Sequence, residues 1–552
     1  MTHNALKNVW RCAALVFLMA ACGAQTPSPT AAPAPQPTVA PSPTALPPTA
    51  TPAPKPTRVI PTAAPDARPV IGAPAWFNDA VIYQIFPRSF YDTNADGIGD
   101  LKGIAQKLDY VQSLGANTIW LNPFYPTTTY HGYDVVDYMA VNPQLGTLDD
   151  FKFLAAEMKK RGMRLIVDYV ANHASNSHPF FKDAYKNPKS KYTTWFHFLD
   201  KGNTQYSSFF GVENLPDWNT DNPDVVKYLI GAAQFWLDLG ADGIRCDYAL
   251  GVEEPFWKQL RAAVKAKHPD AVILGEVWDQ SALTLNKYFG YGFDALFDFP
   301  FELSLVGDIN KNGDGVLNGK DYATFLQAPL KVAQRLYPQD AQLVRFVSNH
   351  DTNRIASEVD TDPARERLAA AVNLLTPGIP EIYYGEEIGM KGSKGPGPFY
   401  DELRREPMDW CKAETCEGMT TWFKPPIRNN APDDGVSVEE EQTGAKSLLN
   451  FYRDLAKLRA AHSALRSRSF LVVDVVEGCQ TACLGIWRWS ADEAVFTLFN
   501  FSGQAQTVTL DDSALPVAIG QNATALLGSA PAPAGMTVDP WGAAVLRWDI
   551  AK

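Results

Sequence analysis

The sequence is short of positive charge. Its 552 residues include 49 Lys and Arg against 61 Asp and Glu, a formal net charge of −12 at pH 7. Because no basic stripe is available to neutralise phosphates, this balance argues against a nucleic-acid partner. The length and the 46% hydrophobic content predict two or three domains with a large core.

The apolar run near the N-terminus is also short. Residues 12–21 are too few to span a membrane stably, and they follow basic residues, as in a targeting segment. The run ends on Leu18-Met-Ala-Ala-Cys22, which resembles the lipobox of bacterial lipoproteins. Residues 1–22 are therefore predicted to be a lipoprotein signal peptide, with Cys22 lipidated as the only membrane anchor. The alternative is an ordinary cleaved signal ending near Ala24, and both predict an extracytoplasmic protein, surface-tethered or secreted.

Cysteines are few, with seven in the chain. Cys411 with Cys416, and Cys479 with Cys483, are local pairs that predict disulfides in an oxidising compartment. A four-cysteine metal site is the alternative, but neither pair has the usual two-residue knuckle spacing. Cys246 is left over and is predicted to be a small buried hydrophobe.

Proline dominates the segment that follows the signal. Between residues 26 and 70, 15 of 45 residues are Pro, interleaved with Thr, Ala and Ser. Such a composition cannot bury enough apolar surface to fold, so residues 23–72 are predicted to be a disordered, extended linker. At ~3.1 Å per residue it would reach on the order of 100 Å.

The rest of the chain alternates between apolar strands and amphipathic helices. Strands are predicted at 79–86, 117–121, 164–168, 242–246, 272–275, 294–297, 344–348 and 379–384. Helices are predicted at 101–114, 147–161, 223–239, 253–267, 364–375 and 446–460. Eight strands alternating with helices indicate the α/β class and a (β/α)8 TIM barrel, placed at residues 73–465.

Two segments depart from this alternation. About fifty residues separate Asp168 from the helix at Pro223, and a structureless loop of that length is improbable. A small inserted domain B at about 172–222 is therefore predicted after the third strand. Residues 466–552 contain short strands split by turns, which predicts a C-terminal antiparallel β-sandwich.

Three barrel strands lead to a carboxylate: Asp247, Glu276 and Asp351. Chemistry collects at the carboxyl ends of the strands of such barrels. Glycosidic hydrolysis needs one protonated and one ionised carboxyl, ~5 Å apart in retaining enzymes. Arg245 is expected to keep Asp247 ionised, and the apolar pair Val277-Trp278 to raise the pKa of Glu276. For any single carboxylate, a cap on the following helix is the plainer explanation.

The motifs around these residues resemble those of a known family. They lie at 168–173, 243–247, 275–278 and 348–351, with others at 215–219, 384–389 and 405–410. In this order they resemble the conserved regions of the α-amylase family of glycoside hydrolases (family 13, clan GH-H). The resemblance runs from about Trp76 to the C-terminus.

The resemblance implies roles for seven residues. Asp247 would be the nucleophile, Glu276 the general acid/base and Asp351 a clamp on sugar hydroxyls. The bound sugar would be contacted by Tyr133 as a stacking platform and by His173, Arg245 and His350. The alternative for each His is a core histidine with satisfied hydrogen bonds, and position at a strand end favours the ligand role.

The resemblance further implies a monomeric retaining hydrolase that cuts α-1,4-glucosidic bonds of starch and maltodextrins through a covalent glycosyl-enzyme intermediate. Other activities of the family remain alternatives: α-glucosidase, cyclomaltodextrinase or neopullulanase, and glucosyl transfer. A non-enzymatic glycan-binding relative is disfavoured because all three carboxylates are present.

Two departures bear on specificity. Tyr130 stands where members that release single terminal glucose units usually carry Asp, which favours an open cleft and internal cutting. Leu250-Gly251 replaces the Lys-His pair that many amylases carry, which leaves the product pattern open.

A second signal is independent of the carboxylates. Oxygen ligands at alternate positions from Asp92 through Asn94, Asp96 and Ile98 (backbone carbonyl) to Asp100 match a loop for a hard cation. The same loop in relatives binds calcium, so Ca²⁺ is the expected cofactor, with an Asx-rich turn as the alternative.

A weaker cation loop is suggested at residues 310–321. Its spacing is that of an EF-hand-like loop, although Asn replaces the leading Asp and position twelve has the shorter Asp. A solvated turn between helices explains it equally well.

Overall fold

The computed structural model describes residues 68–307, 314–319, 322–396, 400–423, 427–510, 512–513, 515–529 and 535–551. The predicted signal peptide, Cys22 and most of the linker lie outside these residues, as do residues 310–313 and 320–321 of the weaker cation loop. Within them, no helix has the length and apolar character needed to cross a membrane.

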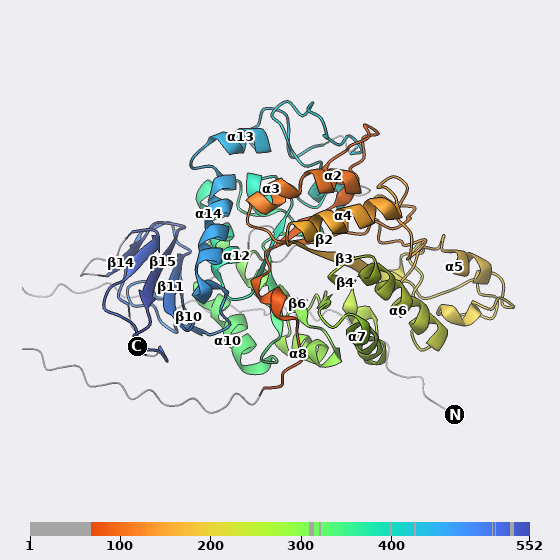
Figure 1. Ribbon diagram of the computed structural model, residues 1–552, viewed down its shortest axis with the longest axis horizontal. Helices are drawn as coiled ribbons and strands as arrows, with labels where there is room; N and C mark the ends of the chain where they lie inside the picture. The colour runs from red at the N-terminus through yellow and green to blue at the C-terminus, as the bar shows by residue number, and fades with distance from the viewer. Residues whose placement is uncertain are drawn as a thin grey trace, which may run out of the picture. The chain divides into compact units, whose positions relative to one another are not determined.

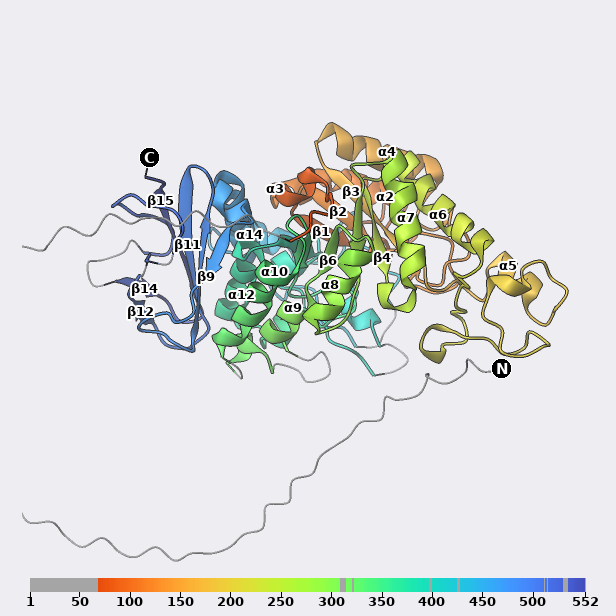
Figure 2. The same cartoon turned by 90° about the horizontal axis from the view of Figure 1, so that it is seen from below.

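Eight parallel strands form a closed barrel, each paired with its neighbours in sequence order and the last paired with the first. The strands are β1 Ile82–Ile85, β2 Thr118–Leu121, β3 Arg164–Val170, β4 Gly243–Asp247, β5 Val272–Gly275, β6 Ala295–Phe297, β7 Gln342–Arg345 and β8 Ile379–Tyr383. Helices surround the barrel (Figures 1 and 2). The predicted TIM barrel is confirmed.

The longer helices between and after these strands are α4 Leu148–Lys160, α6 Pro223–Asp238, α7 Glu254–Lys267, α8 Ala282–Tyr291, α10 Gln327–Leu336, α12 Pro363–Leu375 and α14 Leu448–Ala461. The shorter ones are α1 Pro87–Phe90, α2 Leu101–Gln106, α3 Leu108–Ser113, α5 Pro179–Ala184, α9 Phe299–Leu305, α11 Ile355–Glu358 and α13 Val438–Thr443.

Two helix ends illustrate what local sequence decides. Helix α4 begins with the capping box that its sequence predicts, in which Thr147 accepts from the Asp150 backbone and Asp150 accepts from that of Thr147. The single helix predicted at 101–114 is wrong, because the chain breaks at Lys107 into α2 and α3. Lys107 leaves helical geometry there, with its ammonium 4.1 Å from the centre of the Tyr91 ring.

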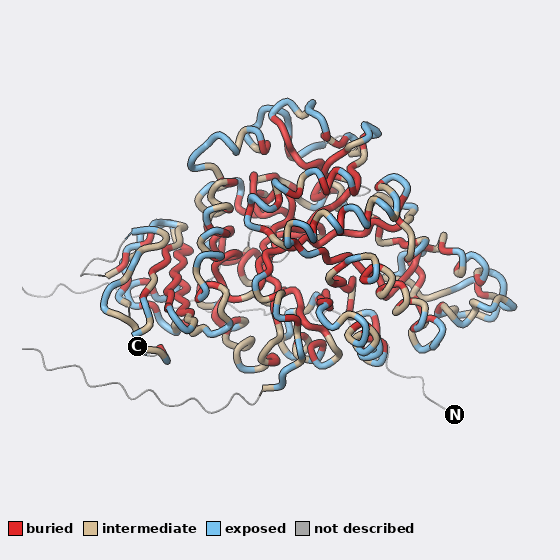
Figure 3. Tube along the Cα trace, in the orientation of Figure 1, coloured by how far each residue is buried: buried red, intermediate tan, exposed pale blue. Residues whose placement is uncertain are grey.

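The barrel interior is packed in layers, and buried residues line the strands (Figure 3). The Trp120 ring of β2 lies 5.2 Å from the Phe297 ring of β6 and 4.9 Å from the Arg245 guanidinium of β4. When the strand register is followed from β6 through β7 to β8, Glu381 falls in the same layer. Side chains from alternate strands form such layers in TIM barrels. A guanidinium and a carboxyl group thus share the barrel centre with two aromatic rings.

The segment between β3 and α6 is the predicted inserted domain. It contains α5, two short 3-10 turns and isolated bridges such as His173 with Asp217. Its core is aromatic, with Phe196 stacked on Trp218 at 4.6 Å and Phe180 on Tyr192 at 4.2 Å.

The C-terminal strands form two antiparallel sheets, in the orders β13-β15-β11-β10-β9 and β12-β14. Their bounds are β9 Phe470–Val472, β10 Cys483–Trp489, β11 Glu493–Asn500, β12 Gln506–Val508, β13 Thr524–Leu527, β14 Met536–Val538 and β15 Ala543–Asp549. The sheet packs against α10, where Gln327 donates to the backbone carbonyls of Val473 and Asp474.

Both cysteine pairs are disulfides, Cys411–Cys416 and Cys479–Cys483. The alternative of a four-cysteine metal site is therefore wrong. Cys246 is a free, buried thiol, as expected.

Candidate active site

The three carboxylates gather at the carboxyl end of the barrel. Asp247 is the last residue of β4 and Glu276 directly follows β5. Asp351 lies further out than predicted, because β7 ends at Arg345. Asn349 then turns the chain, since its side-chain oxygen accepts from the backbone N–H of Asp351 at 2.8 Å.

Arg245 connects the carboxylates. It is fully buried and donates to Asp168 at 2.9 Å, to Asp247 at 3.0 Å and to Glu276. Since Asp247 and Glu276 bind nitrogens of one guanidinium, their nearer oxygens are less than about 8 Å apart. The backbone N–H of Tyr248 donates to the other oxygen of Glu276 at 2.8 Å. One cation thus holds both groups across a space that is open to solvent, with their side chains 10% and 9% exposed.

Burial raises the pKa of Glu276, as the sequence predicted, with Arg245 acting against it. Burial also raises the pKa of Asp247, Arg245 opposes this rise, and the neighbouring Glu276 and Asp168 add to it. The expectation that Arg245 keeps Asp247 ionised is therefore wrong, because burial has the larger influence on the pKa of Asp247. Two buried carboxyls on one guanidinium titrate as a pair, and such a pair retains a proton to higher pH than either group would alone. General acid catalysis requires that shared proton.

Asp351 has a different environment. It pairs with His350 at 3.0 Å and with Arg405 at 2.7 Å. Burial alone would raise the pKa of Asp351, but His350, Arg405 and Arg245 outweigh it and hold the pKa well below its usual range. Asp351 therefore stays ionised, with a side chain 31% exposed.

The predicted sugar ligands lie around the same space. The Tyr133 ring stacks on His350 at 5.5 Å, and its hydroxyl contacts His350 at 2.5 Å and donates to Asp168 at 3.1 Å. His173 is buried, its Nε2 has no hydrogen-bond partner, and burial lowers its pKa to about 3. A neutral imidazole with an unused nitrogen is suited to bind a sugar hydroxyl.

A family model described as "Alpha amylase, catalytic domain" matches residues 84–468. The chain belongs to the α-amylase family of glycoside hydrolases. It is 33% identical to "Alpha-amylase 3" of Dictyoglomus thermophilum over 409 residues, covering 71% of this chain and 79% of the relative. It is also 33% identical to a "Cyclomaltodextrinase" of a Bacillus species over 430 residues, covering 73% and 69%.

A solved structure shares the fold. An alpha-amylase from H. orenii superposes with a TM-score of 0.73 at 30% identity, covering 85% of this chain and 99% of that one. Membership of this family makes the chain a glycoside hydrolase, and an α-glucan oligosaccharide is a substrate that fits the family.

Several residues of this α-amylase-family site were not predicted. Arg405 holds Asp351, and Asp168 holds Arg245. Both lie in motifs quoted above, so position within a motif was the available signal. No sequence signal marked Phe209 and Phe210. Both belong to the inserted domain, and their ring centres lie 4.9 and 5.2 Å from that of Tyr248.

The backbone in this aromatic group is strained. Phe210 has φ 48° and Tyr248 has φ 39°, in the left-handed region that non-glycine residues rarely adopt. The Phe210 side chain is nevertheless 76% exposed. A large exposed ring in a strained conformation, packed on the residue that follows Asp247, offers a flat apolar face to a sugar.

Tyr130 occupies the position at which relatives that release terminal glucose units usually carry an aspartate. Its ring stacks on Trp422 at 5.5 Å, and its hydroxyl lies 3.5 Å from Arg405. The residue is thus part of the wall of the site and supplies no carboxylate.

Proposed function

We propose that the protein is a retaining α-glucan hydrolase of the α-amylase type, cutting α-1,4-glucosidic bonds of starch and maltodextrins. The observation that carries the proposal is the contact of one buried guanidinium, that of Arg245, with both Asp247 and Glu276. Two carboxyls that face one bond and share one proton are what glycoside hydrolysis uses, and the retaining form, which the resemblance implies, needs them ~5 Å apart.

In the first step a carboxylate oxygen of Asp247 attacks the anomeric carbon, and the bond from that carbon to the glycosidic oxygen breaks. Glu276 gives its proton to the departing oxygen, so a glycosyl ester and a free sugar end result. In the second step Glu276 takes a proton from water as the water oxygen attacks the same carbon and releases Asp247. Two inversions preserve the anomeric configuration.

Asp351 and Arg245 act electrostatically in this scheme. Arg245 balances the charge that returns to Asp247 when the ester is cleaved. Asp351, kept ionised by His350 and Arg405, accepts hydrogen bonds from the hydroxyls of the ring.

Tyr130 supports internal cutting. Without a carboxylate at this position, nothing there binds the outer hydroxyls of a terminal sugar, so a longer glucan chain can pass through the site. A cyclomaltodextrin-degrading activity is the second candidate, favoured by the similarity to a cyclomaltodextrinase. Soluble starch and a cyclomaltodextrin, digested side by side and followed by chromatography, separate the two. Rapid loss of starch viscosity supports internal cutting, and preferred ring opening supports the second candidate.

The acid/base role of Glu276 is tested by Glu276→Gln. The substitution keeps the shape but removes the transferable proton, so kcat should fall by at least about 10²–10⁴-fold, with oligosaccharide binding retained. Unchanged turnover would contradict the assignment. NMR of the fresh product tests the mechanism, since the α-anomer is expected first and a β-anomer would exclude retention.

We further propose that the Asp92–Asp100 loop binds calcium. Asp92 and Asp100 are buried, and the carboxylate of Asp92 accepts backbone N–H groups from Asn94, Ala95 and Gly97. The donor set of carboxylate, amide and carbonyl oxygens suits Ca²⁺. No cluster of three or more His, Cys, Asp or Glu side chains is placed to share a metal among the described residues, so Asn94 and the Ile98 carbonyl would have to complete the set.

Chelation tests the loop. Removing calcium with EDTA should lower the melting temperature, and added calcium should restore it, because a ligand that binds only the folded state stabilises that state. Asp96→Asn should weaken the restoration. An unchanged melting temperature would leave an Asx-rich turn as the explanation.

We likewise propose that the protein is tethered to the cell surface through a lipid on Cys22. The mass of the mature N-terminal peptide tests this proposal.

A further inference from the structure

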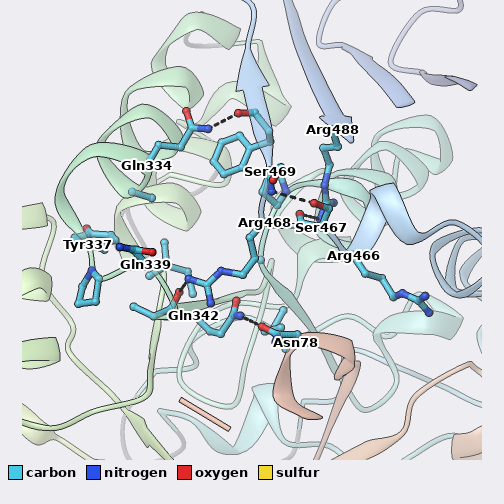
Figure 4. Close-up of a pocket in the computed structure, with 18 of the residues that line it drawn as sticks. Asn78, Gln334, Tyr337, Gln339, Gln342, Arg466, Ser467, Arg468, Ser469 and Arg488 are labelled. Atoms are coloured by element: carbon cyan, nitrogen blue, oxygen red, sulfur yellow. Dashed lines mark hydrogen bonds between the residues drawn. The ribbon is translucent and has the colours of Figure 1, made fainter. Parts of the chain in front are cut away.

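A second polar cavity lies on the opposite end of the barrel from the catalytic carboxylates. It has a volume of about 520 Å³ and is lined by the end of α10, the starts of β7 and β8, and residues 466–470 (Figure 4). Five arginines line this cavity, which we call the arginine groove: Arg68, Arg345, Arg466, Arg468 and Arg488.

The groove is one-sided in charge. None of its described lining residues is Asp or Glu, although the whole chain carries a net charge of −12. Two of the arginines have counter-ions outside the lining: Arg345 pairs with Asp298, and Arg466 with Asp79 at 3.3 Å. Within the described residues, Arg468 and Arg488 form no direct ion pair, and the nearest charge that attracts Arg468 is Asp340, between lining residues 339 and 341.

Arg488 is the most deeply buried arginine of the groove. It is 1% exposed, and its neighbours in charge are Arg459 and Arg345, which both repel it. Its terminal nitrogens donate to the backbone carbonyls of Thr376 at 3.3 Å and Ser467 at 2.8 Å. Its Nε has no partner. Capping the last turn of α12 explains the terminal nitrogens, and the helix dipole offsets part of the charge, but no carboxylate among the described residues pairs with this buried cation.

Arg468 supplies the accessible charge. Its side chain is exposed and extends toward Gln342, and its one hydrogen bond goes to the Ala341 carbonyl at 3.0 Å (Figure 4). A guanidinium has five N–H donors, so most of those on Arg468 remain for a ligand. Planar guanidinium groups bind phosphate oxygens two at a time.

We infer that the arginine groove binds a phosphate-type oxyanion, held by Arg468 at its mouth and balanced by Arg488 at its floor. The cavity is larger than one such ion. Amide side chains line the remaining space, namely Asn78, Gln334, Gln339 and Gln342 (Figure 4). They match the hydroxyls of a phosphorylated sugar, while free phosphate would use the arginines alone.

Calorimetric titration of the full chain tests the inference, with inorganic phosphate and glucose 6-phosphate as probes and glucose as the neutral control. Sodium chloride is matched in ionic strength, because screening alone changes surface electrostatics. Saturable phosphate binding is expected, and Arg468→Gln should weaken it by about tenfold while Arg468→Lys retains more of it. Arg367→Gln, outside the groove, should leave it unchanged.

The two probes identify the source of the anion. Tighter binding of the sugar phosphate means that the amide side chains contact the sugar, and equal binding means a site for the free anion. Absence of saturation, or equal affinity in Arg468→Gln, would overturn the inference. Starch hydrolysis without phosphate should be unchanged in Arg468→Gln, so a failure here is distinguishable from a failure of the proposed hydrolase function.

Discussion

Glu381 makes the stability of this barrel depend on pH in a way that one substitution can isolate. The side chain is fully buried in the layer of Trp120, Arg245 and Phe297, and neither of its carboxyl oxygens has a hydrogen-bond partner. Burial raises the pKa of Glu381 well above its ordinary value, and Glu386 raises it further, while Arg245 acts in the opposite direction. We therefore expect Glu381 to keep its proton in the folded protein at a pH at which the unfolded chain has lost it.

The direction in which stability changes with pH follows from the difference in proton binding between the folded and unfolded states. Below the unfolded pKa of about 4.3 the group is protonated in both states and has no effect on the pH dependence. Above it only the unfolded state loses the proton, so the free energy of unfolding falls by about 1.4 kcal/mol per pH unit until the folded pKa is passed. Glu381→Gln keeps the shape and removes the titration. Its stability relative to the unmodified protein should therefore rise by roughly 3 kcal/mol between pH 5 and pH 7.

Urea unfolding of both proteins at pH 5, 6 and 7 measures this difference. Other buried carboxyls contribute equally to both curves, so only Glu381 separates them. Glu213→Gln, which changes an exposed side chain of the inserted domain, serves as the control and should track the unmodified protein. If the Glu381→Gln curve runs parallel to that of the unmodified protein from pH 5 to pH 7, Glu381 is ionised in the folded state and the reasoning fails.

Two further predictions concern single contacts. Arg405→Leu removes the guanidinium that pairs with Asp351 at 2.7 Å, so kcat/KM on maltodextrin should fall by about 10- to 100-fold. Circular dichroism should show that the fold is retained. An unchanged kcat/KM would show that His350 alone is enough to hold Asp351 in place. Cys411→Ser with Cys416→Ser opens a disulfide that closes a short loop, so the free energy of unfolding in urea should fall by about 2 kcal/mol, and no change would mean that the pair is not oxidised in solution.

Much of the fold could be read from periodicity. The eight strands were placed within a few residues because buried parallel strands are continuous apolar runs, and α4 was placed by its cap at Thr147. The break at Lys107 was missed since periodicity continues across it. No strand was predicted at β13 or β14, because segments of four and three residues are too short to show a period.

The candidate site divides in the same way. Asp247 and Glu276 could be named because each ends a local pattern, a strand that leads to a carboxylate. The ionisation of Asp247 could not be predicted, since it depends on Glu276 and Asp168 as well as on Arg245, and their proximity is a product of barrel closure. Phe210 was missed because nothing local marks a loop residue that folds back over a distant strand.

By itself the sequence determined the barrel and the inserted and C-terminal domains, and it named the carboxylates proposed as catalytic, because these follow from local periodicity and short motifs. Only the tertiary structure decided which charges share a space: Arg245 between two carboxyls, Glu381 in the layer of Arg245, and the five arginines gathered at the far end of the barrel. The physical reason is that electrostatic energies depend on distance and burial. Both are set by strand register and closure, which join residues hundreds of positions apart.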